Sequence, residues 1–378
     1  MEAIGIIAIA QLSAAGGTAP YTGPLDIVAG AVVAYGQRAL SAAQRSSALY
    51  TIRRDSDDAT QVFSSDAITG DAPLESIASF LGTPKYCAFA EIVSGGSGYS
   101  DGQFIATLVG GVYDTQASVS VIAADGSVVS VDVINNPGSY TTPPTGIITT
   151  SGGDGTGLTL RCIFRGVGFY TNFNDQSGNA ANVLTVIEDF EPSWAMFYNN
   201  IPCLALLDGQ ATGILQGNDG SLTWDGGPGT LFVVVNVSSS GNNASTTFSV
   251  DQTPSNNNFF DLSALGTNIT PYTEMQSGMT FSEWDVDVPS AIGTGLSVLE
   301  LIYDADGNVS LYRNGVSVSM SGGSVVPLPA ITGRFRLQLG SGVFYAVFEV
   351  VLWNSELSSG NRALIRQNMA DYYGIALS

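Results

Sequence analysis

The sequence predicts an all-β protein: a sandwich or jelly roll with a small inserted β module and a short C-terminal helix. The chain has 378 residues, of which 44% are hydrophobic and only 12% charged, and it contains 45 glycines. This composition is typical of β strands joined by tight turns. Segments with strand patterns recur at even spacing along most of the chain, while segments with helical spacing are few and short.

The first element, residues 1–24, is interpreted as an anchoring arm. It opens with the apolar decamer MEAIGIIAIA and continues into the turn-rich segment TAPYTGP. Because a free apolar arm would expose hydrophobic surface, we expect it to dock on a partner subunit or on the body; an ordinary first strand is the alternative. The decamer is too short to span a bilayer and lacks the basic start of a signal peptide, so we expect neither membrane insertion nor secretion by the usual signal.

The first part of the sandwich is expected in residues 25–83. Residues 49–54 (LYTIRR) alternate as in a half-buried strand. The segment LESIASFL (Leu74–Leu81) has helical spacing and follows Asp71 and Pro73, which are helix start signals. We therefore expect one short helix here.

Residues 84–165 differ in character and are expected to form an inserted β module. Two glycine-rich stretches, residues 91–111 and 131–153, form a weak internal repeat. Between them, Asp125-Gly126 marks the tip of a hairpin. A phosphate-binding loop is excluded because no helix-forming segment follows GGSGYSDG.

The remainder of the sandwich is expected in residues 166–378. The apolar run FVVVNV (Phe232–Val237) predicts a fully buried strand. The turn signals Asp306-Gly307 and Asn314-Gly315 divide residues 297–320 into three strands. The closing segment SSGNRALIRQNMADYYGI predicts a C-terminal helix that packs on the sandwich.

Composition also excludes several function classes. The net charge is −21 and Lys85 is the only lysine, which disfavours binding to nucleic acid and to anionic membranes. The chain has no histidine, so histidine-dependent nucleophile systems and imidazole metal ligands are absent, and we expect no cofactor. Three cysteines without C-x-x-C spacing exclude a metal knuckle. Cys87 and Cys162 could approach each other, but buried free thiols are the preferred interpretation.

Four stretches occur in a recognisable order: TGPLDIVAGAVVAYGQRAL, ALYTIRRDSDDATQVF, GFYTNFNDQSGNAANVL and IPCLALLDG. Together they resemble the laminin-G-like, concanavalin-A-like domain of phage tail and virion proteins, with the DQSGN motif intact at residues 175–179. The resemblance covers residues 20–83 and 166–378. Since that family runs almost directly from the short helix into DQSG, the resemblance implies that residues 84–165 are an insertion, which itself resembles a G-S-G-Y β module of phage structural proteins.

The resemblance implies a virion protein, assembled in the host cytoplasm and exposed as a tail fibre, appendage or capsid decoration. Its arm would bind other virion proteins, and its loops and inserted module would bind a host-surface glycan or receptor. Phage fibres and decorations are often trimers, so the resemblance also implies a homo-oligomer. A bacterial surface adhesin is a further alternative, disfavoured because no export signal is visible.

The same order of motifs also resembles the catalytic domain of fungal arabinofuranosidases, which carries a vicinal cysteine pair that this chain lacks. In SEWDVDV, the carboxylates Glu283, Asp285 and Asp287 would share one face of a strand. Carboxylates two residues apart lie about 6 to 7 Å from each other, near the separation that glycosidases use. The alternative function is therefore a glycoside hydrolase, although an acidic strand face in water is the preferred interpretation and we expect no enzyme activity.

Asp304, Asp306 and Asn308 offer oxygen ligands at alternate positions, as a calcium loop does, but a hairpin turn explains them more simply. Arg53 and Arg54 are expected to pair with acids, and we name Asp57 and Asp175 as the candidates.

Sugar binding would use aromatic side chains at loop tips beside polar residues, because an aromatic ring covers the apolar face of a sugar. Four residues lie in contexts rich in Gly, Pro, Asp or Thr and are the candidates: Tyr99, Tyr140, Trp224 and Tyr272. The alternative for each is a ring that closes the rim of the sandwich.

Overall fold

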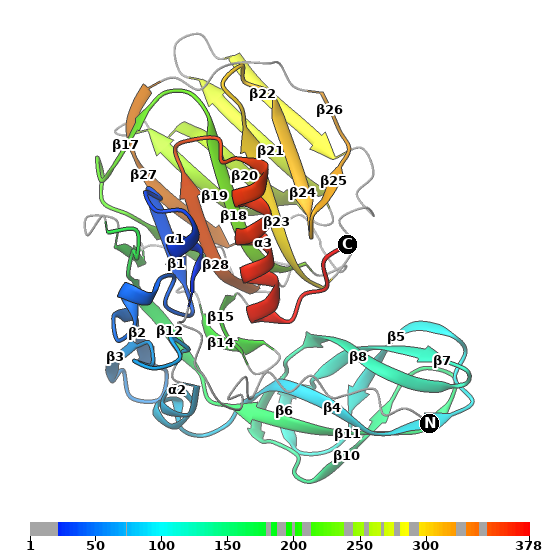
Figure 1. Cartoon of the computed structure of the whole chain (residues 1–378). Coiled ribbons are helices and arrows are strands. Elements are labelled where there is room, and N and C mark those ends of the chain that lie inside the picture. Colours follow the sequence, from blue (N-terminus) through cyan, green and yellow to red (C-terminus); the bar gives the residue numbers. More distant parts are fainter. Residues whose placement is uncertain are drawn as a thin grey trace.

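The protein is a β sandwich with a separate β module beside it (Figure 1). The computed structural model describes residues 22–72, 74–178, 183–186, 194–198, 201–205, 213–237, 245–252, 257–265, 268–275, 280–286, 295–322, 330–339 and 346–378. Its elements are nearly all strands, so the predicted all-β class is confirmed. Most of the expected N-terminal arm lies outside the described residues.

The first sheet forms around β28 (Ala346–Trp353) and β18 (Gly229–Val237), which pair in antiparallel fashion. Both strands are buried over almost their whole length, as the run FVVVNV predicted. The remaining strands are β1 (Val33–Gly36), β23 (Gly295–Tyr303), β24 (Val309–Arg313) and β25 (Val316–Val318), with β15 (Ile201–Ala205) and β14 (Trp194–Tyr198) leading towards the second sheet.

The second sheet is centred on β27 (Ala330–Leu339), which pairs with β19 on one side and with β16 and β17 on the other. Its other strands, in spatial order from one edge, are β3 (Thr60–Ser64), β2 (Ala48–Arg54), β12 (Gly168–Phe173), β13 (Leu184–Val186) and β16 (Gly213–Gln216). The strand β17 (Leu222–Asp225) follows β16 along the same edge of β27. Beyond β27 follow β19 (Ser245–Gln252), β20 (Asn257–Leu265), β21 (Asn268–Met275), β22 (Thr280–Val286) and β26 (Met320–Gly322).

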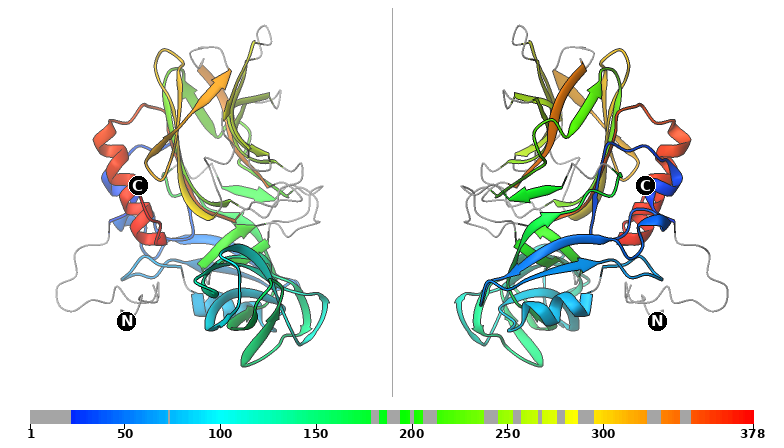
Figure 2. Two further views of the ribbon diagram at one scale, coloured as in Figure 1. Left: turned by 90° about the vertical axis from the view of Figure 1, so that its right-hand side faces the viewer. Right: turned by 90° about the vertical axis from the view of Figure 1, so that its left-hand side faces the viewer.

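The two sheets enclose a shared apolar core, and Figure 2 shows the sandwich from two sides. The ring of Tyr35 on β1 lies 5.7 Å from that of Phe335 on β27 and 6.0 Å from that of Phe173 on β12, measured between ring centroids. These contacts join the first sheet to the second, which fixes which face of β27 points inward.

The helices are short, as predicted. The helix α2 (Leu74–Leu81) occupies the predicted residues and buries Ile77 and Leu81. The C-terminal helix α3 (Ser359–Tyr373) packs on the outer side of the first sheet through Tyr373, whose ring centroid lies 5.5 Å from that of Phe348. The small helices α1 (Pro24–Ile27) and η1 (Ala42–Gln44) complete the set described. In the described part of the chain, no helix is long and apolar enough to span a bilayer.

The DQSGN segment holds the β1 region in place through hydrogen bonds to its backbone. One carboxylate oxygen of Asp175 accepts hydrogen bonds from the backbone N–H groups of Ala34 (3.0 Å) and Ser177 (2.7 Å). The side chain of Gln176 accepts from the N–H of Leu40 at 2.9 Å and donates to the carbonyl of Arg38 at 2.9 Å. Through these contacts Asp175 fixes its own turn and links it to β1.

The strands between Tyr86 and Arg165 form sheets of their own. A six-stranded sheet contains β4 (Tyr86–Ser97), β11 (Thr156–Arg165), β10 (Ile147–Ser151), β5 (Gly102–Leu108), β7 (Ser118–Ala124) and β8 (Ser127–Asn136), and a smaller one contains β6 (Val112–Thr115) and β9 (Ser139–Thr142). The predicted hairpin joins β7 to β8, with positive φ angles at Asp125 (53°) and Gly126 (78°). In Figure 1 this module lies beside the end of the sandwich that carries α2.

Candidate functional site

The outward-facing side of β27 carries two arginines. Along this strand Phe335 and Leu337 are buried in the core, so the alternating residues Arg334 and Arg336 point to the opposite side of the second sheet. We call that side the outer face. The side chains of Arg334 and Arg336 are partly buried there, and the neighbouring Ser249 and Asp251 are fully buried.

The strand register aligns a row of polar residues with Arg336. Directly paired residues of neighbouring antiparallel strands share one face of a sheet, so a single row crosses six strands from β16 to β22. The row consists of Gln216, Arg336, Ser249, Asp261, Tyr272 and Glu283. By residue type the row contains hydrogen-bonding residues and one aromatic residue, the types that sugar sites use, and within it Ser249 is fully buried.

A buried carboxylate supports Arg336 from within the outer face. Asp251 on β19 has no exposed surface; its Oδ1 accepts a 2.7 Å hydrogen bond from Ser249, and its Oδ2 lies 3.6 Å from Nη1 of Arg336. Nη2 of Arg336 donates to Oε1 of Gln338 at 3.0 Å, so the guanidinium is held from two sides.

The pKa of the Asp251 carboxyl differs from that of an ordinary surface carboxylate. Burial raises the pKa of the Asp251 carboxyl, although the hydrogen bond from Ser249 and the charge of Arg336 act in the opposite direction. Oδ2 of Asp251 accepts no hydrogen bond within the part of the chain that the structure describes. Next to this group, Arg334 forms an ion pair with the more exposed Asp219.

The predicted acidic strand lies at the far end of the row. Glu283 and Asp285 are on β22, where Glu283 pairs with Tyr272 and Asp285 pairs with Ser321 of β26. Asp287 lies outside the described residues. The structure thus places two separately predicted candidates, the aromatic Tyr272 and the acid Glu283, opposite each other.

Three of the four predicted sugar-binding aromatics are core residues. Trp224 is fully buried on β17, Tyr140 is 1% exposed and Tyr99 is 5% exposed. Tyr99 stacks on Phe104 with ring centroids 5.0 Å apart, and the Tyr140 hydroxyl accepts a hydrogen bond from the N–H of Ala117. The expectation that these rings stand exposed at loop tips is therefore wrong, because each closes a core instead.

The Asp304 loop is a turn held by its own hydrogen bonds. Oδ1 of Asp304 accepts from the N–H groups of Asp306 (2.9 Å) and Asn308 (2.8 Å), and Oδ2 accepts from the Asn308 side chain (2.8 Å). Burial acts to raise the pKa of Asp304, but these hydrogen bonds outweigh it and lower the pKa. Among the described residues no group of three or more acidic or cysteine side chains could hold a metal ion.

The adjacent arginines are structural, as expected for Arg54. Arg54 pairs with Asp57, its Nη2 lying 2.6 Å from Oδ2 of the acid, and its guanidinium lies 5.0 Å from the ring of Phe80. Arg53 pairs with Asp58. These contacts fix the turn after β2.

Cys87 and Cys162 approach each other on the paired strands β4 and β11, and both are free thiols in the structure. Their hydrogen bond, together with burial, raises the pKa of the Cys87 thiol well above its ordinary value. A buried thiol with a raised pKa is a poor nucleophile, which favours a structural role for Cys87.

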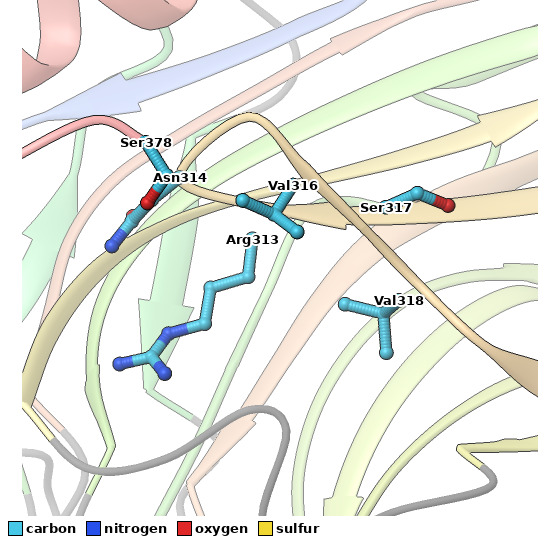
Figure 3. A pocket seen from close by; sticks show the side chains of 6 residues that line it. All are labelled: Arg313, Asn314, Val316, Ser317, Val318 and Ser378. Atoms are coloured by element: carbon cyan, nitrogen blue, oxygen red, sulfur yellow. The ribbon is translucent and has the colours of Figure 1, made fainter.

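A small pocket of about 280 Å³ lies beside the β24–β25 hairpin (Figure 3). Burial lowers the pKa of Arg313, whose Nε donates to Ser297 at 2.9 Å. Among the described residues, the pocket's lining includes neither an aromatic side chain nor an Asp or Glu, so the outer face is the stronger candidate for sugar binding. The lining residues are Arg313, Asn314, Val316, Ser317, Val318 and Ser378.

Sequence reasoning missed Arg334, Arg336 and Asp251. The alternation in RFRLQL would have placed the two arginines on one face of a strand. Their alignment with Ser249 and with the acidic strand depends on pairing between segments distant in the chain, for which the sequence holds no local signal.

No family model matches the chain, and no curated protein matches it either. Solved structures do resemble it. An arabinofuranosidase complexed with arabinofuranosyl-α-1,2-xylobiose matches with a TM-score of 0.54 and 14% identity, and a mutant GH54 α-L-arabinofuranosidase soaked with 4-nitrophenyl α-L-arabinofuranoside with 0.53 and 14%. Both matches cover 93% of this chain and 65% of the enzyme. The binding domain of botulinum neurotoxin serotype D matches with a TM-score of 0.39 and 14% identity, over 52% of this chain and 48% of the toxin domain. At 14% identity, the likeness to the two arabinofuranosidases shows that the fold is a β sandwich of the kind found in those enzymes.

Proposed function

We propose that this chain is a glycan-binding attachment protein and that the glycan lies along the outer face of the second sheet. The observation that carries the proposal is the row in which Arg336, held by Asp251 and Gln338, is aligned with Tyr272 and Glu283. An arginine fixed by its neighbours loses little side-chain entropy when it donates to sugar oxygens, which favours binding. A carbohydrate ligand is in line with the resemblance to an arabinofuranosidase complexed with arabinofuranosyl-α-1,2-xylobiose.

We propose binding rather than hydrolysis because the described carboxyl groups with a raised pKa are buried. A general acid needs both a raised pKa and contact with the glycosidic oxygen. Among the carboxyl groups that the structure describes, Asp251 and Glu300 have the first property, but both are buried and neither reaches a substrate; Asp251 instead positions Arg336.

The test is calorimetric titration of the whole chain with a panel of soluble oligosaccharides. We expect one or more to bind, and Arg336→Gln to weaken binding by about tenfold or more, as the loss of a charged hydrogen bond implies. Arg161→Gln removes an equally charged side chain paired with Glu91 on the inserted module and serves as the matched control, with unchanged affinity. Because Arg336 also contacts Asp251, Glu283→Gln provides a second variant whose effect does not pass through the buried carboxylate.

Two results would contradict the proposal. Equal affinity of the Arg336 and Glu283 variants and the wild type would place the glycan elsewhere. Release of free sugar from the same panel, abolished in Glu283→Gln, would instead establish the glycoside hydrolase that the sequence left as its alternative.

The proposed setting is the surface of a phage particle, which rests on the resemblance of the sequence motifs. Mass spectrometry of purified particles, together with antibody labelling in electron micrographs, tests it. We expect the chain to be found on the exterior of the head or tail; its absence from purified particles would remove this part of the proposal without affecting the glycan site.

A further inference from the structure

The inserted module carries most of the exposed large hydrophobic side chains in the described part of the chain. Ile105 is 44% exposed, Ile122 39% and Ile147 60%. The full set on the module is Val93, Ile105, Val109, Val112, Tyr113, Ile122, Val129 and Ile147, against Val62, Ile68, Val316 and Leu364 elsewhere.

Several of these residues lie on one face of the six-stranded sheet. On β5, Ala106 and Leu108 are buried in the module's core, so Ile105 points to the other side. Ile105 pairs with Ser120 of β7, and Ile122, two residues further along β7, pairs with Gln103. Ile105 and Ile122 are therefore diagonal neighbours, close enough to form one patch.

The patch continues across β10. The N–H of Val109, just beyond β5, donates to the carbonyl of Thr149 at 2.9 Å. Ile147 lies two residues before Thr149 and faces the same way, because the intervening Ile148 is buried. We call the outward side of β10, β5 and β7 the neutral face. It consists of Gln103, Ile105, Thr107, Val109, Ile122, Ile147, Thr149 and Ser151, together with the buried Ser120, whose hydroxyl accepts a hydrogen bond from the Gln103 amide.

None of these nine residues is charged, although the chain as a whole carries −21. Residues 84–165 contain three basic and six acidic residues, a net charge of −3, which leaves −18 on the rest of the chain. The neutral face is bordered on β11 by Arg161, which is itself paired with Glu91. Two copies of the chain can therefore bring these faces together without the repulsion that contact between their acidic bodies would cause.

We propose that the neutral face is a contact surface between copies of this chain. A basic partner would be drawn to the acidic body, whereas a second copy offers the same uncharged surface of apolar and hydroxyl side chains. Two sheet faces pack about 10 Å apart, and a two-fold axis would lay each neutral face on its counterpart. This inference is independent of the proposed glycan site.

The test is sedimentation of the whole chain over a range of concentrations. We expect reversible self-association that strengthens with added salt, because salt screens the repulsion between the bodies. Ile105→Glu combined with Ile122→Glu should weaken association by about a hundredfold or more, since unpaired charges would be buried on both sides. Ile68→Glu alters an isoleucine of the body that is 75% exposed and is the matched control, with unchanged association. Thermal unfolding of each variant verifies that it folds.

The proposal is overturned if the wild type stays monomeric at the highest concentration, or if the double variant associates as tightly as Ile68→Glu. Deletion of residues 1–21 should leave association unchanged. If that deletion abolishes self-association while the double variant still associates, the copies are joined by the apolar N-terminal segment and not by the neutral face.

Discussion

Gln176 connects the DQSGN segment to the β1 region through both ends of its side chain. Its Oε1 accepts from Leu40, its Nε2 donates to the carbonyl of Arg38, and its own N–H donates to the carbonyl of Ala34. The side chain is 3% exposed, so water cannot replace a lost contact. The same loop places Arg38 against Glu349, an ion pair with almost no exposed surface.

Gln176→Ala should lower the free energy of unfolding by about 2 to 4 kcal/mol, because it leaves buried backbone groups without partners and opens a cavity. Urea unfolding at neutral pH measures this. The control is Gln367→Ala on the surface of α3, where the side chain donates a hydrogen bond to Asp371 and the expected change is below about 0.5 kcal/mol. Equal effects of the two substitutions would contradict a structural role for the motif.

Glu300 gives a prediction of pH dependence. Burial raises its pKa above the ordinary value of 4.5, although Arg362 and Arg366 of α3 act to lower it. A carboxyl whose pKa is higher in the folded state contributes stability that is fully present below the unfolded pKa and is lost as the pH rises through the folded pKa. Relative to Glu300→Gln, the wild type should therefore lose stability as the pH rises from the ordinary pKa of 4.5 through the higher pKa of the folded state. Unfolding of both proteins across this range measures the difference; a difference that grows in favour of the wild type with rising pH would contradict it.

At the scale of elements, the β7–β8 hairpin depends on a glycine for its backbone and not for space. Gly126 has φ of 78°, and a Cβ added there would meet no atom closer than 4.0 Å. Gly126→Ala should lower the free energy of unfolding by about 1 to 2 kcal/mol through backbone strain alone. Gly360→Ala, in the first turn of α3 with open space around it, should instead raise it by about 0.4 to 1 kcal/mol. Thermal melting of both variants compares the two, and a stabilising Gly126→Ala would show that the turn does not need its left-handed conformation.

Local signals in the sequence were sufficient for elements of this kind. The Asp125-Gly126 and Asn314-Gly315 turns and the helix at Leu74–Leu81 are where their residue types place them, because turn chemistry and helical spacing act over a few residues. The burial of Trp224 was not predictable in this way, because the residue follows a Gly- and Asp-rich sequence that is typical of a loop. In the structure it pairs with Ile331 in the interior of the second sheet.

The candidate site shows the same limit. Sequence reasoning selected Tyr272 and Glu283 for unrelated reasons, an exposed ring and a carboxylate pair. Only the pairing of β21 with β22, and of β27 with β19, aligns them with Arg336 and Asp251. Register between strands distant in the chain is set by the whole core, so it has no local signature.

At the scale of the whole molecule, the inserted module joins the sandwich through two neighbouring chain segments, one at Lys85 and one at Arg165 and Gly166, which we call the neck. The N–H of Lys85 donates to the carbonyl of Arg165 at 2.6 Å, and a Cβ added at Gly166 would lie 2.3 Å from the carbonyl oxygen of Leu81. The backbone of the neck therefore packs directly on the end of α2. We therefore expect these contacts to restrict the movement of the module relative to α2.

Gly166→Ala should separate the neck from α2 and lower the free energy of unfolding by about 1 to 3 kcal/mol, as overpacking does. Small-angle scattering should also show a broader range of distances between the two parts of the molecule. Gly360→Ala is the control with unchanged scattering. Identical scattering and stability of Gly166→Ala and the wild type would contradict a rigid connection.

The most direct test of the glycan site is hydrogen–deuterium exchange of the whole chain, with and without an oligosaccharide that binds in the calorimetric panel. Increased protection is predicted in peptides from β27 and β19 to β22, and not in the inserted module or in the hairpin that carries Arg313. Protection confined to the module, with β27 and β19 unchanged, would contradict the assignment of the outer face as the binding surface.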